Sequence, residues 1–317
     1  MIRTASILTT GAVALLLAAA QPALAQPPLT QDGHTNHAAH GPHGHAAFAS
    51  DRIQVAVEGQ GPDVIFIPGL SSSPAVWQGS VDHLNGAYRV HRIHVSGFAG
   101  APAEANATGP VAAPVAEEIA RYIREQGLQK PAVVGHSMGG TMGLMLAARH
   151  PDLVGKLMIV DMVPFMGAMF GPPGTTAQSV APDADQVFTA QSTAPRDQYQ
   201  TQARAAVTGM IKTEAARPGP LNDVETSDQQ VSASAFRELI VTDLRPELSK
   251  ITAPVEVLYV KFNDPRMTDA ITDAIYQMSF ATLPGAKLKR IGDSAHFIML
   301  DQPTAFYGDL DAFLSAK

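Results

Sequence analysis

The stretch VVGHSMGG, residues 133–140, places a serine between glycines at the junction of two different sequence patterns. The residues before it form a short apolar run, which is typical of a strand buried on both faces of a parallel sheet. The residues after it, 138–150, predict a helix that ends before a proline. A serine in a sharp strand-to-helix turn needs neighbours almost without side chains, and Gly135 and Gly139 meet that need. The G-x-S-x-G pattern in this context predicts that Ser137 is a nucleophile.

The same alternation of strand and helix extends along most of the chain. Short apolar or alternating segments predict strands at 53–59, 63–69, 88–95, 131–135, 155–163, 253–260 and 286–292. Segments with apolar residues at helical spacing predict helices at 76–84, 113–126, 138–150, 267–278 and 304–316. This order is typical of the α/β class, in which a mostly parallel, doubly wound sheet is covered by helices on both faces.

One long segment interrupts the alternation. Residues 165–246 are rich in Gly, Pro, Ala, Thr and Gln, with helix-like pieces, and predict a helical subdomain after the strand that follows the Ser137 helix. It opens with MVPFMGAMF, whose methionine and phenylalanine side chains suit an acyl pocket. Met166 and Phe170 are therefore candidates for the substrate pocket, and the alternative is that they only pack this subdomain onto the core.

A serine nucleophile needs a base, and His296 is the best candidate among eleven histidines. It follows the last predicted strand and precedes the C-terminal helix in GDSAHFIMLDQP. The base in turn needs a carboxylate to orient it. Asp264 follows the strand at 253–260 and gives the chain order Ser137, Asp264, His296, so we predict it as the acid. Asp161, at the end of the preceding strand, is the alternative.

Acyl transfer also needs backbone N–H groups aimed at the developing oxyanion. Met138 N–H lies at the start of a helix, whose dipole favours negative charge. The second donor is expected after an earlier strand, where Gly69 lets the chain turn closely and leaves Leu70 N–H available. The alternative for this second position is an ordinary Pro-Gly turn.

The N-terminus has the pattern of a cleaved secretory signal, residues 1–25. Arg3 precedes an apolar run, and the segment ends in Ala23-Leu24-Ala25, a small-residue cleavage site. The apolar run is shorter than the ~20 residues that a membrane-spanning helix needs. We therefore expect an exported protein, periplasmic or secreted, with no membrane span after cleavage.

The composition of residues 26–50 predicts a linker, and one domain is expected to follow at 51–317. The linker contains five closely spaced histidines: His34, His37, His40, His43 and His45. Imidazoles at this density attract metals weakly, but the glycines and Pro42 between them prevent one helical face from organising a site. A disordered tether is the favoured interpretation and a metal-binding arm is the alternative.

Composition excludes several classes of function. The formal net charge of the 317 residues is -7, which gives no electrostatic footprint for nucleic acid. The chain has no cysteine, so disulfides, thiolate catalysis and cysteine zinc sites are excluded.

Five segments of the sequence resemble the α/β-hydrolase superfamily, in its serine esterase-like branch with a cap: FIPGLSSSPAVW, VVGHSMGGTMGLMLAARHP, LMIVDMVP, NDPRM and AHFIMLDQPTAF. The resemblance covers about residues 52–317 and implies that the inserted subdomain is a cap at the position of the family's lids. Two departures affect the acyl side: Pro68 stands where many relatives have histidine, and His94 lies near the place where relatives often carry aspartate.

These residues predict a serine hydrolase that cleaves a small-molecule carboxylic ester through an acyl-enzyme and needs no cofactor. The serine nucleophile argues against the dehalogenase and epoxide-hydrolase branches, which the resemblance ties to aspartate. Lactonase, carbon–carbon hydrolase, aminopeptidase and cofactor-free haloperoxidase activities remain open alternatives. A different class of answer is a non-catalytic exported protein with a histidine-rich metal-binding arm.

Overall fold

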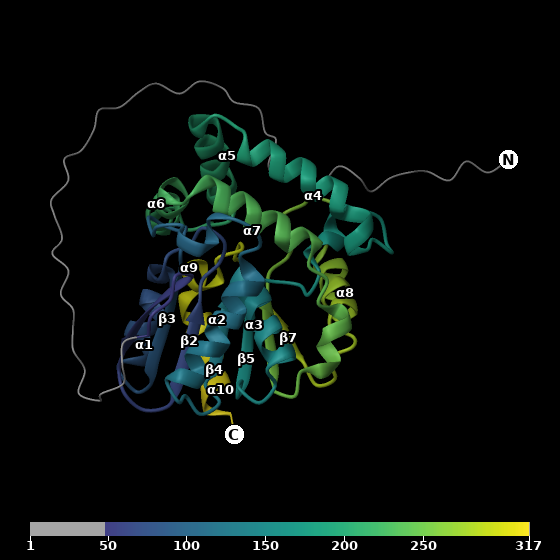
Figure 1. Ribbon diagram of the computed structural model, residues 1–317. Coiled ribbons are helices and arrows are strands. Elements are labelled where there is room, and N and C mark those ends of the chain that lie inside the picture. Colours follow the sequence, from purple (N-terminus) through teal and green to yellow (C-terminus); the bar gives the residue numbers. More distant parts are fainter. Residues whose placement is uncertain (1–47, 317) are drawn as a thin grey trace.

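A computed structural model describes residues 48–316 of the chain (Figure 1). The predicted signal peptide and the five histidines of the predicted linker lie outside the described residues. Between residues 48 and 316, seven strands form one sheet in the order β1-β3-β2-β4-β5-β6-β7. The strands are β1 (Ile53–Glu58), β2 (Asp63–Ile67), β3 (Arg89–Val95), β4 (Ala132–His136), β5 (Lys156–Val160), β6 (Val255–Tyr259) and β7 (Lys287–Arg290).

All pairings in the sheet are parallel except that of β1 with β3. The central strand β4 is buried along its whole length, which explains its continuous apolar sequence. The register brings Gly135 of β4 beside Ile67 of β2, and His136 beside Val160 of β5. The residues that follow β2, β4 and β5 therefore emerge together at one edge of the sheet.

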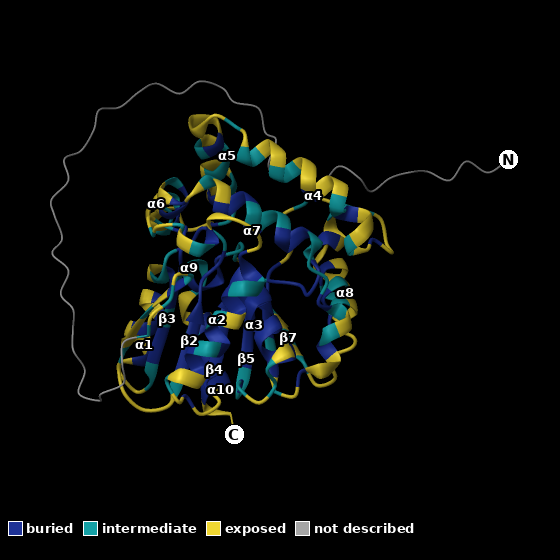
Figure 2. Ribbon diagram, in the orientation of Figure 1, coloured by how far each residue is buried: buried dark blue, intermediate teal, exposed yellow. Residues whose placement is uncertain are grey.

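Helices cover both faces of the sheet and form two apolar clusters (Figure 2). One face carries α2 (Ala112–Glu125), α3 (Met138–Arg149) and α8 (Asp269–Ser279). The other carries α1 (Gln78–Leu84), α9 (Ile298–Asp301) and α10 (Pro303–Ser315). The predicted doubly wound α/β sheet is therefore confirmed.

The segment expected to form a cap lies between β5 and β6. It contains the short 3-10 helix η4 (Met166–Phe170) and four α-helices: α4 (Ala177–Ser192), α5 (Arg196–Gly209), α6 (Pro218–Thr226) and α7 (Gln229–Val241). Figure 1 shows α4–α7 together beyond one end of the sheet, and hydrogen bonds join them to the loops after β2 and β3. The cap therefore covers the carboxyl ends of the parallel strands.

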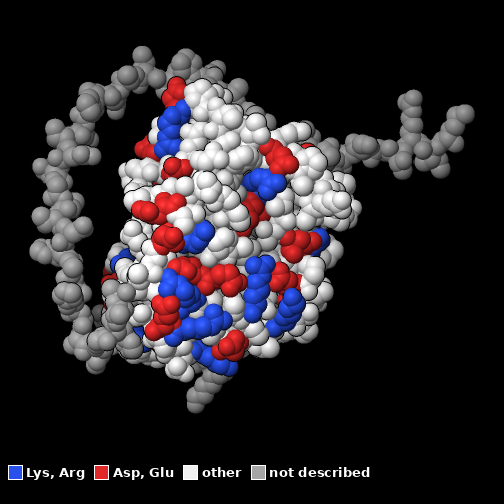
Figure 3. All heavy atoms as spheres, viewed as in Figure 1, with Lys and Arg blue, Asp and Glu red and all other residues white. Residues whose placement is uncertain are grey.

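The surface in view is mixed in charge, with Lys and Arg interspersed among Asp and Glu over the sheet domain (Figure 3). Over residues 48–316, no helix is both long and apolar enough to cross a membrane.

Candidate active site

Ser137 occupies the turn between β4 and α3, with φ 53° and ψ -121°. This backbone conformation is rare for a residue with a side chain and costs free energy that the surroundings must offset. The glycines on either side make the turn possible. A Cβ at Gly135 would lie 2.2 Å from the carbonyl oxygen of Gly139, and one at Gly139 would lie 2.2 Å from that of Ile67. Any larger residue at these two positions would collide with backbone, as the sequence pattern predicts.

The structure pairs His296 with Asp161. Nδ1 of His296 lies 2.6 Å from Oδ2 of Asp161, whose side chain is only 10% exposed. A hydrogen bond to Nδ1 fixes the tautomer of an imidazole and leaves Nε2 to act on another group. Asp161, the alternative acid of the sequence analysis, is therefore the carboxylate that contacts His296.

The expectation that Asp264 orients His296 is wrong. Asp264 lies in the loop after β6 and forms a salt bridge with Arg266, with an N–O distance of 2.6 Å. Hydrogen bonds from the side chain and backbone of Arg266 lower the pKa of Asp264 to about 2. This carboxylate therefore has its own local partner and does not contact the histidine.

The reason for this correction lies in the order of the strands. β5 is the direct neighbour of β4, whereas β6 is one strand further away. His136 pairs in register with Val160, so Ser137 and Asp161 each follow the last residue of adjacent parallel strands. The N–H of Ser137 donates to the carbonyl of Val160 at 2.9 Å, which joins the two strand ends directly.

The carboxylate of Asp161 is held by two further donors. Its Oδ1 accepts hydrogen bonds from the backbone N–H of Val260 and from the hydroxyl of Tyr276, both at 3.0 Å. Burial raises the pKa of Tyr276 well above its usual value, so this phenol keeps the proton that it donates. Asp161 also has a left-handed backbone, with φ 54°, which is a second strained position beside Ser137.

His136, which the sequence analysis did not include in the site, anchors the backbone of the base. Its Nε2 lies 3.1 Å from the carbonyl oxygen of His296 and must donate, because a carbonyl only accepts. The two imidazole rings are 4.6 Å apart between centroids. Burial lowers the pKa of His136 well below its usual value, so its ring is neutral. This hydrogen bond joins the backbone of His296 to the residue directly before Ser137.

The expected oxyanion donors lie on two backbone segments that meet at Ser137. Met138 is the first residue of α3, so its N–H has no partner within the helix. Gly69 approaches so closely that a Cβ there would lie 3.2 Å from Cβ of Ser137 and 3.0 Å from Nδ1 of His136. Leu70 follows this contact directly.

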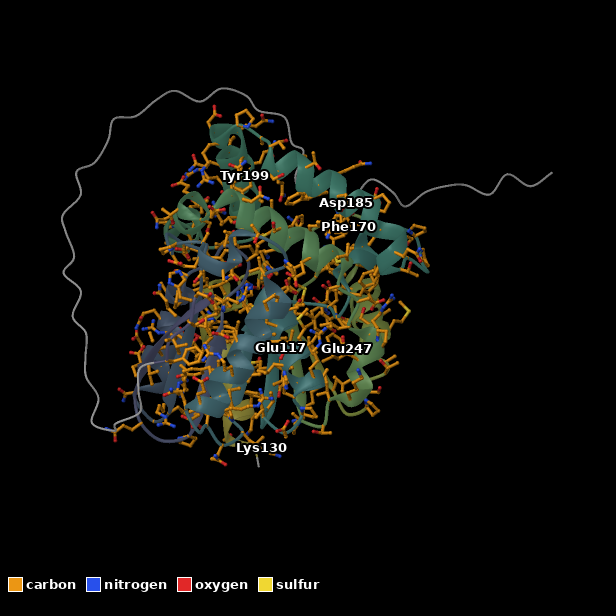
Figure 4. The ribbon with its side chains drawn as sticks, viewed as in Figure 1. Glu117, Lys130, Phe170, Asp185, Tyr199 and Glu247 are labelled. Atoms are coloured by element: carbon orange, nitrogen blue, oxygen red, sulfur yellow. The ribbon has the colours of Figure 1, made fainter. Side chains whose placement is uncertain are left out.

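The two candidate pocket residues pack against other side chains of the cap and core. Phe170 contacts the ring of Phe236 on α7, with ring centroids 6.5 Å apart, and Figure 4 shows it near α4. Met166 packs against both the sheet domain cluster and the small apolar cluster of the cap. Met166 therefore joins the cap to the core, whereas the contacts of Phe170 lie within the cap.

Metal ligands are not grouped in the part of the chain from Phe48 to Ala316. No three His, Cys, Asp or Glu side chains in that part are arranged to hold a metal ion.

Comparison with known proteins agrees with this fold. The family model described as the alpha/beta hydrolase fold matches residues 62–303. Over 274 residues the chain is 26% identical to a pimeloyl-(acyl-carrier protein) methyl ester esterase of Vibrio atlanticus (strain LGP32), covering 83% of this chain and 98% of that protein.

Solved structures share the same fold. An esterase from Exiguobacterium antarcticum matches with a TM-score of 0.69 and 20% identity, over 83% of this chain and 96% of that chain. An enol-lactonase from Burkholderia xenovorans matches with a TM-score of 0.64 and 20% identity, over 83% and 96% of the two chains. With its parallel sheet, its strained serine turn and a family match over most of its length, the chain belongs to the α/β-hydrolase fold family.

Proposed function

We propose that this ester hydrolase cleaves carboxylic esters through Ser137 as nucleophile, His296 as base and Asp161 as the orienting acid. The observation that carries the proposal is the 2.6 Å contact between His296 and Asp161 beside the strained turn of Ser137. The esterase named among the relatives supports an ester as the substrate class.

In the proposed reaction, Nε2 of His296 takes the proton of the Ser137 hydroxyl as Oγ attacks the ester carbonyl. The carbonyl π electrons move to oxygen, and the N–H groups of Leu70 and Met138 stabilise that oxyanion. The intermediate expels the alkoxide, which takes the proton from His296 and leaves as an alcohol. Water, deprotonated by the same histidine, then attacks the acyl-enzyme and releases the carboxylic acid and free Ser137.

A fluorophosphonate probe and a panel of chromogenic esters with graded acyl length test this proposal on the chain that begins at Gln26. Ser137→Ala should lose probe labelling and lower kcat by several orders of magnitude, because only binding and oxyanion stabilisation remain. His296→Ala should lower kcat by a similar factor, since the two residues act as a unit. Labelling that persists in Ser137→Ala would contradict the assignment of the nucleophile.

We also propose that the protein is exported, on the basis of the apolar N-terminal run and Ala23-Leu24-Ala25. The mature chain is expected to begin at or within a few residues of Gln26. Intact-mass measurement of the protein from the periplasm or medium tests this, and a retained Met1 segment would contradict it.

We also propose that Met166 contributes to the acyl pocket, while the contact of Phe170 with Phe236 favours a packing role for that residue. A metal-binding arm is the alternative to a simple tether for the histidine-rich linker. Metal titration of the protein with and without residues 26–50 distinguishes a metal-binding arm from a simple tether.

A further inference from the structure

The loop that follows β2, residues 69–73, is joined to the cap by buried polar contacts. The hydroxyl of Ser71 lies 2.8 Å from the hydroxyl of Ser232 on α7, and both residues are buried. Ser71 has φ 55°, a left-handed backbone that a serine adopts only when its surroundings hold it there.

A second contact comes from α6. The carboxylate of Asp223 accepts the backbone N–H of Ser73 at 2.8 Å, and the residue is 8% exposed. Burial raises the pKa of Asp223, which means that the ionised carboxylate is held here against a desolvation cost. A cap that only needed to adhere to the core could do so with apolar side chains at lower cost.

A third contact comes from Ser227, which is 1% exposed. Its hydroxyl donates to the backbone carbonyl of Asp223 at 2.7 Å and accepts the N–H of Ala99 at 2.8 Å. Its Oγ lies 3.4 Å from the carbonyl oxygen of Ser71. The cap is therefore hydrogen-bonded to the loop after β2 at Ser71 and Ser73, which follow Leu70, and to the loop after β3 at Ala99.

We propose that Asp223 and Ser232 of the cap are positioning residues that hold the Leu70 N–H in place for the oxyanion. This proposal rests on the proposed ester hydrolysis and deepens it. The contacts hold Ser71, which directly follows Leu70, and Ser73, two residues further along, while Gly69 before Leu70 packs on Ser137. Consequently the cap and the oxyanion loop form one unit, and changes in the cap alter the rate of the chemical step as well as the choice of substrate.

The experiment compares two aspartates of the cap that both accept a backbone N–H. Asp223 accepts from the oxyanion loop, whereas Asp228 accepts from Val231 within its own helix at 2.9 Å. Asp223→Ala should lower kcat by about 10- to 100-fold with KM changed less than about twofold, since an oxyanion donor acts only in the transition state. Affinity for an alkyl boronic acid, which forms an oxyanion adduct with the serine, should fall by the same factor. Asp228→Ala should change the melting temperature but leave kcat and boronate affinity near wild type.

A conservative variant separates positioning from folding. Asp223→Asn keeps an oxygen that can accept the Ser73 N–H and should restore most of kcat. Ser232→Ala removes only a hydroxyl and should disturb the fold less than Asp223→Ala. It should lower kcat and boronate affinity in the same way, by a smaller factor.

Three outcomes would overturn the proposal. First, Asp223→Ala and Ser232→Ala could leave kcat unchanged or raise KM alone. The cap would then contribute to substrate binding but not to the position of the oxyanion donor. Asp228→Ala could lower kcat as much as Asp223→Ala, which would indicate a general effect of cap stability. If the wild-type protein neither hydrolyses esters nor reacts with the fluorophosphonate, the proposed function itself is contradicted. If the wild type is active but the Asp223 and Ser232 variants keep its rate, only the positioning role is contradicted.

Discussion

The hydroxyl of Tyr276 lies 3.0 Å from Oδ1 of Asp161, on the carboxylate whose other oxygen binds His296. Tyr276 comes from α8, far along the chain, and stacks on Tyr259 at the end of β6 with ring centroids 3.9 Å apart. The hydroxyl of Tyr259 in turn donates to Asp273 at 2.9 Å. The carboxylate of Asp161 is thus held by a tyrosine that is itself fixed in a stacked aromatic pair.

Tyr276→Phe should keep the ring packing and remove one of the two hydrogen bonds to Oδ1 of Asp161. The carboxylate then has more freedom to rotate, and we expect kcat to fall by roughly 3- to 30-fold with KM little changed. The free energy of unfolding should fall by about 1.5–3 kcal/mol, because a buried hydrogen bond to a charged group is lost. Steady-state kinetics and urea titration measure both effects, and an unchanged kcat would show that Val260 N–H alone orients the acid.

Asp161→Asn and Asp264→Asn distinguish the two carboxylates directly. The Asp161 variant should lose about 10⁴-fold in kcat, since an amide neither stabilises the imidazolium nor favours the right tautomer. The Asp264 variant should lose less than about threefold, because its carboxylate pairs with Arg266 in an exposed loop. Measured kcat values in the opposite order would show that Asp264, in the loop after β6, is the acid.

Two buried neutral histidines predict a loss of stability in mild acid. Burial lowers the pKa of both His91 and His136, so the unfolded chain binds protons below about pH 6.5 that the folded chain does not. Stability should therefore fall as pH decreases through this value. His136→Gln, which keeps a donor for the His296 carbonyl, should reduce the slope by up to about 1.4 kcal/mol per pH unit. Urea titrations at pH 7.5 and 5.5 test this, and equal slopes for variant and wild type would refute it.

Gly135→Ala should disrupt the turn that carries Ser137. The added Cβ would meet backbone atoms of Gly139 at 2.2 Å, which neither side can relieve by a side-chain movement. We expect a loss of about 3 kcal/mol or more in stability and near-complete loss of hydrolysis. Gly308→Ala on α10 is the matched control, because nothing lies within 4 Å of its Cβ and it should stabilise the helix by up to about 1 kcal/mol. A stable, active Gly135→Ala protein would mean that the turn can relax.

Replacing Phe170 or Met166 by Ala separates the two roles considered for the opening of the cap. The contacts of Phe170 with Phe236 favour packing, so Phe170→Ala should lower the melting temperature and leave acyl-length preference nearly unchanged. Met166 contacts both clusters and is the better candidate for a shift in preference. The ester panel and a thermal melt on each variant decide between these roles. A changed acyl-length preference in Phe170→Ala would show that Phe170 lines the substrate pocket.

The sheet and the serine turn could be predicted because local patterns specify them. Short apolar runs, helical spacing and the two glycines around Ser137 each indicate one structure without knowledge of the rest of the chain. The prediction of His296 rests on a signal of the same kind, its position after the last strand. These signals lie in residues that are neighbours in the chain, so a single sequence is sufficient to predict the sheet and the turn.

The acid could not be predicted because its identity depends on which strands are adjacent. Asp161 and Asp264 both follow a strand, and only the order β4-β5-β6 makes Asp161 the nearer neighbour of Ser137. The roles of Tyr276 and Asp223 depend on contacts across 115 and 150 residues, which no local pattern encodes. A usable signal for Asp161 was its place directly after β5, as Ser137 directly follows β4.

With Asp161 as the proposed acid, the turn at residues 263–267 has no part in the proposed reaction. Its polar contacts are local, chiefly the Asp264–Arg266 pair, whereas Val260 just before it must remain to bind Asp161. Surface loops that make no long-range contacts tolerate inserted sequence with little loss of stability. An epitope tag, a surface-attachment cysteine or a short peptide could therefore be built into this turn while the enzyme keeps its rate.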